Sequence, residues 1–130
     1  MKTITRLFNV LAVFAMIAAS TAFAADRTVH TSSAFAGPKA NTGTAMHLYE
    51  GNQSILRVSA DFKVPDAPAP TWRIVDSKGT VYTLDAFKIK GGEKRQVNVP
   101  AYVKDIAKVQ VYCAWPEVLL GESSFSSAVQ

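Results

Sequence analysis

The sequence predicts a single all-β domain, an antiparallel β-sandwich or barrel-like fold of about six to eight short strands. Apolar and polar residues alternate over several short stretches, and turn-forming residues recur about every eight to twelve positions. The chain has 130 residues, of which 48% are hydrophobic and 18% are charged. That length allows one domain, and the composition excludes a disordered polar chain or a coiled coil.

The first 24 residues have the three parts of a signal peptide. Lys2 and Arg6 make a positive start, residues 7–19 form an apolar block too short to span a bilayer, and Ala22-Phe23-Ala24 is a small–x–small cleavage site. We therefore expect cleavage after Ala24 and a single exported domain over residues 25–130, periplasmic or secreted. We expect no membrane anchor after cleavage, the alternative being an uncleaved leader.

The charge pattern argues against a nucleic-acid partner. The whole chain carries a net charge of +4, and the leader holds two of its 14 basic residues and none of its ten acids, which leaves +2. A nucleic-acid footprint needs a clustered basic face. The nearest cluster is Lys88, Lys90, Lys94 and Arg95 around Gly91-Gly92, which is more typical of a solvated hairpin end than of a polyanion site.

The first strands are expected near residues 28–31 and at Thr44–Tyr49. The second of these alternates, with Met46 and Leu48 on one face and His47 on the other. We therefore expect His47 to be an exposed strand residue and His30 to lie in a loop near the start of the domain.

The clearest strand signal follows a turn at Glu50–Gln53. Apolar residues occupy every second position from Leu56 to Val64, with polar residues between them, which predicts a strand with one buried face. Prolines at positions 65, 68 and 70 end this strand.

The second half of the domain is expected to continue with short hairpins. Its expected elements are, in order, a strand at Thr71–Val75 with Trp72 and Ile74 on one face, a turn at Asp76–Gly79, a strand at Thr80–Leu84, a strand at Arg95–Val99, one or two helical turns in Tyr102–Lys108, and strands at Val109–Trp115 and Val118–Leu120. The last residues, 123–130, are expected to be poorly ordered apart from Phe125.

Cys113 is the strongest candidate functional residue. A single cysteine excludes an internal disulfide, a CxxC pair, a multi-cysteine metal site and c-type haem attachment. Strand alternation places Cys113 and Trp115 on an apolar face with two valines, and Tyr112 on the other. Cys113 is therefore either a buried, inert thiol or a redox thiol near a strand end, with Tyr112 and Trp115 as aromatic contacts for a prosthetic group.

Metal and hydrolytic sites have less support. Cys113, His30, His47 and Met46 are the residue types of an electron-transfer copper site, but no His or Met follows the cysteine and Met46 and His47 point to opposite faces. No motif supports either histidine as an axial haem ligand. There is no GxSxG motif, and only a nucleophile–base pair at hydrogen-bond distance in the structure would revive a hydrolase hypothesis. We expect no metal site, and the sequence favours a protein that is not an enzyme.

Several motifs together resemble the DM-thirteen electron-transfer domain family over about residues 34–125. The matching pieces are Phe35 with Thr42-Gly43-Thr44, Leu56-Arg57 through Asp61-Phe62, Pro70 to Val75, Lys88 to Gly91, Asn98-Val99-Pro100, Asp105-Ile106 to Val109, Val111-Tyr112-Cys113 and Val118 to Gly121. The resemblance implies an extracellular β-sandwich-like module for electron transfer. Its cysteine, here Cys113, would act as a bare thiol or help to hold a prosthetic group such as haem, although no motif in this chain supports haem, and Tyr112 stands where the family usually has Trp.

Two functional hypotheses follow. The first is an exported redox module that uses Cys113 and an unknown redox partner. The second is a non-catalytic binding or scaffold sandwich in which Cys113 is structural and the partner is a protein.

Overall fold

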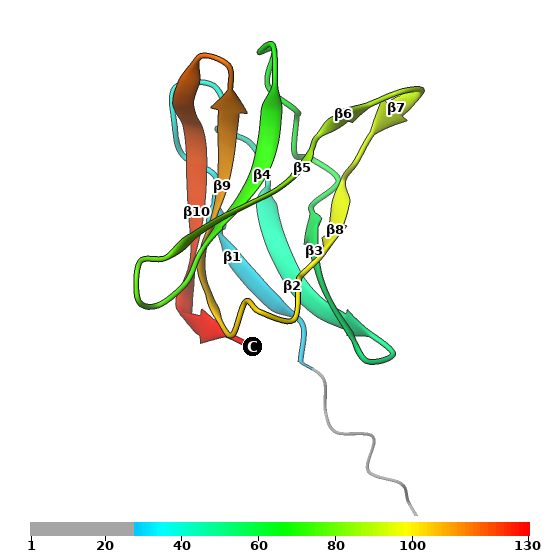
Figure 1. The fold of residues 1–130 in the computed structure, drawn as a ribbon, viewed down its shortest axis with the longest axis vertical. Helices are drawn as coiled ribbons and strands as arrows, with labels where there is room; N and C mark the ends of the chain where they lie inside the picture. Colours follow the sequence, from blue (N-terminus) through cyan, green and yellow to red (C-terminus); the bar gives the residue numbers. More distant parts are fainter. Residues whose placement is uncertain (1–27) are drawn as a thin grey trace, which may run out of the picture.

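The computed structural model describes residues 28–130, so the predicted signal peptide lies outside the described residues. These residues form ten β-strands and no helix. The strands build two four-stranded antiparallel sheets and one small hairpin (Figure 1). The predicted fold class, an antiparallel β-sandwich, is confirmed.

The first sheet has the strand order β1-β2-β3-β8, and the second has the order β10-β9-β4-β5. The strands of the first sheet are β1 (His30–Ala34), β2 (Thr44–Glu50), β3 (Gln53–Val58) and β8 (Gln96–Asn98). Those of the second are β4 (Pro70–Val75), β5 (Val81–Ala86), β9 (Ile106–Ala114) and β10 (Glu117–Val129). The separate hairpin consists of β6 (Lys88–Ile89) and β7 (Gly92–Glu93).

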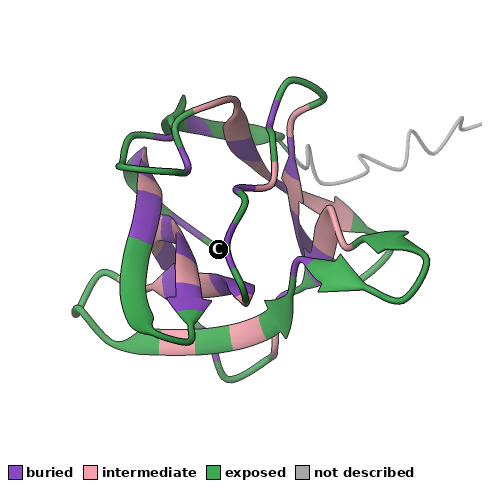
Figure 2. Ribbon diagram, turned by 90° about the horizontal axis from the view of Figure 1, so that it is seen from above, coloured by how far each residue is buried: buried purple, intermediate pink, exposed green. Residues whose placement is uncertain are grey.

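The two sheets are joined along the β1 and β10 side. Just after β1, Ala36 and Glu122 exchange two backbone hydrogen bonds of 2.9 Å, and the Ser124 amide donates to the Ser33 hydroxyl at 3.0 Å. Seen from its end, the fold is a ring of strands around a buried interior (Figure 2). The sandwich is therefore closed on one side, as in a partial barrel.

A chain of aromatic rings fills much of this interior. Trp72 stacks on Phe87 at 4.5 Å between centroids, Phe87 on Phe62 at 5.5 Å, and Phe62 contacts Phe35 at 5.0 Å. The indole Nε1 of Trp72 donates to the Lys94 carbonyl at 2.8 Å, which satisfies its one polar group. These contacts connect the second sheet to the loops that follow β1 and β3.

The strand predicted from Leu56 to Val64 is shorter in the structure. β3 ends at Val58, because the Ser59 hydroxyl accepts the Thr44 amide and the Ser59 carbonyl accepts the Phe62 amide. Gly43, with a φ of 71°, lies against this bend, where a Cβ would come 2.7 Å from the Phe62 backbone. The alternation beyond Val58 thus places Phe62 in the core from a loop rather than from a strand.

Two further predictions are wrong. Residues 102–108 form no helix, because Ile106 begins β9 and pairs with Val129. The C-terminal residues belong to the strand β10, which extends to Val129. The prediction missed this strand because its inner face carries the small residues Gly121 and Ser123 beside Phe125. Small polar residues weaken the hydrophobic pattern without weakening the backbone ladder.

Candidate functional site

Cys113 lies at the end of β9, on the inner face predicted for it. Its side chain is 1% exposed, and its strand neighbours Val109 and Val111 are fully buried. The thiol Sγ donates a hydrogen bond to the Trp115 carbonyl at 2.9 Å. A reagent or cofactor therefore reaches the sulfur only if the structure around it opens.

Trp115 and Tyr112 do not share a site with the Cys113 sulfur. The prediction that Trp115 lies on the buried face is wrong, because β9 ends at Ala114 and the Trp115 side chain, in the turn, is 73% exposed. Tyr112 lies on the outer face, with the Arg73 guanidinium 4.2 Å from its ring centroid. Cys113 meets only the backbone of Trp115, so the three residues form no common pocket in the described structure.

The β9–β10 turn carries an exposed apolar surface. We call Trp115, Val118 and Leu119 the hairpin tip; Val118 is 45% exposed and Leu119 is 38% exposed. Leu119 pairs with Tyr112, so the hairpin tip continues onto the outer face of the second sheet. The tip lies at the end of the sandwich away from the C-terminus (Figure 1). Val118 pairs with Cys113 and Leu119 with Tyr112, so these two side chains leave the hairpin on opposite faces, on either side of the exposed Trp115. Large exposed apolar side chains at a turn offer contacts to a partner surface.

A pocket of about 530 Å³ opens at the opposite end of the sandwich. Its lining includes Ser54 on β3, Lys104, and Asp105, whose carboxylate accepts hydrogen bonds from Ser77. Lys104 Nζ donates to the Ala101 carbonyl at 3.1 Å. The lining therefore combines hydroxyl, ammonium, carboxylate and amide groups with a partly apolar wall.

His47 lies behind Ser54, and the prediction that it is exposed is wrong. Its side chain is 1% exposed because β2 turns Ala45 and His47, rather than Met46 and Leu48, toward Leu56 and Val58 of β3. Nε2 of His47 lies 2.7 Å from the Ser54 hydroxyl, and Nδ1 is buried with no hydrogen-bond partner among the described residues. Burial, and then the nearby His30, lower the pKa of His47 below its ordinary value of 6.5, which keeps the imidazole neutral at pH 7.

The Ser54–His47 pair is the nucleophile–base contact that the sequence did not reveal. The two residues sit on neighbouring strands, seven positions apart, with no motif around them. Catalytic serines also need a third group that orients the imidazole. In residues 28–130 no side chain hydrogen-bonds to Nδ1, so the pair lacks the third, orienting group of a catalytic triad.

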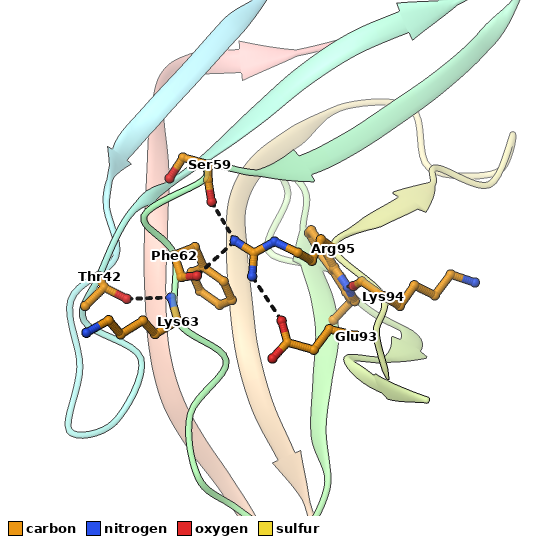
Figure 3. Close-up of polar contacts among 8 residues, drawn as sticks. Thr42, Ser59, Phe62, Lys63, Glu93, Lys94 and Arg95 are labelled. Atoms are coloured by element: carbon orange, nitrogen blue, oxygen red, sulfur yellow. Dashed lines mark hydrogen bonds and ion pairs between the residues drawn. The ribbon is translucent and has the colours of Figure 1, made fainter. Parts of the chain in front are cut away.

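The basic cluster around Gly91-Gly92 forms the predicted hairpin end. Lys94 pairs with Asp85 at 2.6 Å, and Arg95 pairs with Glu93 at 3.1 Å. Arg95 also donates to the Ser59 and Phe62 carbonyls at 2.7 and 2.9 Å, which ties the loop after β3 to the chain before β8 (Figure 3). Both cations are thus engaged in holding loops together rather than presented to a polyanion.

Two further features concern residues 28–130 as a whole. No helix within residues 28–130 is long and apolar enough to cross a membrane. Nor do these residues bring three or more His, Cys, Asp or Glu side chains together as a metal site.

Comparisons with protein-family models, with curated proteins and with solved structures find no match for this chain. The resemblance to the DM-thirteen family, and the electron transfer that it implies, therefore remain predictions.

Proposed function

We propose that this chain is an exported, non-enzymatic binding module whose protein partner docks on the hairpin tip. The observation that carries the proposal is the exposure of Trp115, whose large side chain is 73% exposed at the end of the β9–β10 hairpin. Keeping an indole exposed forgoes the free energy of its burial, and a partner surface would recover it.

The surroundings of Trp115 resemble the centre of a protein interface. Trp, Tyr and Arg dominate the binding energy at such interfaces, and here Tyr112 and Arg73 lie stacked on the face that continues from Leu119. Arg73 Nε is buried and has no partner among the described residues, so its guanidinium is only partly satisfied. We expect a partner with an apolar socket for Trp115 and an acceptor group for Arg73.

Cys113 has a structural role in this proposal. Its Sγ–H holds the Trp115 carbonyl, so the thiol fixes the backbone from which the indole projects. A fixed backbone lowers the entropic cost of docking an exposed side chain.

The experiment is site-specific photo-crosslinking in the native host. A benzoylphenylalanine placed at position 115 is compared with one at position 102, where Tyr102 is also exposed (62%) but lies on the loop that follows β8. A discrete adduct from position 115 alone supports the proposal. The identified partner, once purified, should bind Trp115→Ala at least about 30-fold more weakly than wild type, and Tyr102→Ala normally. Equal adducts from both positions, or unchanged binding by Trp115→Ala, would overturn it.

Electron transfer through Cys113 is the second candidate function, with or without a prosthetic group. The observation in its favour is the position of the sulfur directly beneath an exposed turn, separated from solvent by the Trp115 backbone. This function requires the turn to open. A visible absorption spectrum of protein from its native host tests for a bound haem or copper, and thiol labelling of the folded protein tests for a bare redox thiol.

A further inference from the structure

We propose that His30 and His47 form a two-imidazole site for a divalent late transition-metal ion, copper or zinc. The two residues are direct cross-strand partners on β1 and β2, so their side chains project from the same face of the sheet. Their ring centroids lie 6.2 Å apart. This inference is independent of the hairpin tip, which lies at the other end of the sandwich.

The unpartnered Nδ1 of His47 is the observation that points to a ligand. It is a buried polar atom that no described residue satisfies, in a side chain that is almost fully enclosed. Buried polar atoms without partners are rare in folded proteins and call for an explanation. A metal ion bound at Nδ1 would provide one.

The Ser54 contact, together with the unpartnered Nδ1, favours the His47 tautomer that a metal needs. If the Ser54 hydroxyl donated to Nε2, Nδ1 would carry an orphaned N–H, and buried unpaired N–H groups are the rarest kind. The favoured arrangement is therefore Nε2–H donating to Ser54 Oγ, with a lone pair on Nδ1. Metal-binding histidines show this same arrangement, in which the other ring N–H is held by a neighbouring acceptor.

The spacing of the two rings fits one shared ion. With metal–nitrogen bonds of about 2.0 Å, two imidazoles on one ion place their centroids about 4.5 to 6.3 Å apart for bond angles from 90° to 180°. The observed 6.2 Å lies at the upper limit of that range, and the two rings are stacked with 23° between their planes, so the His30 ring has to turn before its nitrogen lone pair faces Nδ1 of His47. His30 is exposed at the first position of β1, so its ring can turn aside to admit an ion and then approach His47.

The donor set selects the class of ion. Neutral imidazole nitrogens suit copper, zinc and nickel better than magnesium or calcium, which prefer oxygen ligands. Only two protein ligands are proposed, so water completes the coordination. Affinity along the series of divalent ions is highest for Cu²⁺, which makes it the sharpest probe.

The test is a titration of the untagged protein with Cu²⁺, followed by electron paramagnetic resonance. The chain contains only two histidines, so a spectrum with two imidazole nitrogens at one equivalent of copper assigns both ligands. We expect His30→Gln and His47→Gln each to remove one imidazole signal and to weaken binding at least tenfold. Zn²⁺ should compete for the same site and displace copper from the wild-type protein only when it is in large excess.

Three further variants distinguish metal ligands from neighbouring residues that do not bind the metal. Ser54→Ala should keep both imidazole signals while weakening binding about tenfold, as expected for a positioning residue. Met46→Leu and Cys113→Ser should change neither signal nor affinity, because Met46 faces the opposite side of β2 and Cys113 ends a different strand. Unchanged binding by His30→Gln, or a spectrum with one imidazole or none in the wild type, would overturn the proposal. His30 is exposed, so its variant decides the outcome even if His47→Gln fails to fold.

Discussion

The thiol of Cys113 lies 2.9 Å from the carbonyl oxygen of Trp115, so a buried thiol is hydrogen-bonded to the backbone of an exposed tryptophan. The contact joins the inner face of β9 to the backbone of the β9–β10 turn. It also means that chemistry at the sulfur and movement of the turn are coupled.

The first prediction concerns this thiol. In the folded protein, Cys113 should react with a thiol reagent such as DTNB much more slowly than in denatured protein, because its sulfur is 1% exposed. Cys113→Ser should lower the free energy of unfolding by about 1–3 kcal/mol, since a hydroxyl replaces a thiol in an apolar site. Chemical denaturation measures this value, and the exposed neighbour variant Ala114→Ser should change it by no more than about 0.5 kcal/mol. Rapid labelling of native protein would favour electron transfer instead.

The second prediction concerns Gly121, which lies on the β1 and β10 side where the two sheets are joined. A Cβ on Gly121 would collide with the Ala40 carbonyl oxygen and come 2.8 Å from the Ala40 side chain. Gly121→Ala should therefore lower the free energy of unfolding by at least about 1–3 kcal/mol, because backbone has to move. Gly92→Ala is the matched control, since nothing lies within 4 Å of its added Cβ and its φ is not positive. Equal stability of the two variants would show that the backbone around Gly121 and Ala40 moves apart without a loss in the free energy of unfolding.

Period-two alternation explains what could be predicted from the sequence. It placed Val109, Val111 and Cys113 on one buried face, and the turn residues at Asp76–Gly79 predicted the β4–β5 hairpin. These features depend on residues that are close in the chain.

The features that were missed depend on residues from different strands. In β2 both faces carry an apolar or aromatic residue, and only the pairing of His47 with Leu56 decides which face turns inward. The Ser54 hydroxyl that hydrogen-bonds to His47 comes from β3, and the neighbouring imidazole of His30 comes from β1. Alternation predicts the period of a strand, but it does not determine which face points inward when neither face is clearly polar.

The third prediction compares the half-buried Ser54 with the buried Ser123. Ser54→Ala should lower the free energy of unfolding by about 1–3 kcal/mol, because it leaves both ring nitrogens of His47 without a partner. The Ser123 hydroxyl is buried and has no hydrogen-bond partner among the described residues. Ser123→Ala should therefore leave stability unchanged or raise it by up to about 1 kcal/mol. Thermal or urea unfolding of both variants, without added metal, measures the contrast, and a larger loss in Ser123→Ala would contradict it.

The fourth prediction concerns acid stability and the turn between β4 and β5. Desolvation alone would raise the pKa of Asp76, but hydrogen bonds from Thr80, Tyr82 and Lys78 outweigh it and lower the pKa below its ordinary value of 3.8. A carboxyl group with a lower pKa in the folded state stabilises the fold above its unfolded pKa, and this contribution is lost as the pH falls through the folded pKa. The stability difference between wild type and Asp76→Asn should therefore be largest above about pH 4 and shrink on further acidification. Urea unfolding from pH 2.5 to pH 7 measures it, with Asp66→Asn as the control because no hydrogen bond or ion pair to the Asp66 carboxylate is found within residues 28–130. A wild-type advantage over Asp76→Asn that stays constant across this range would show that the turn does not depend on the carboxylate charge.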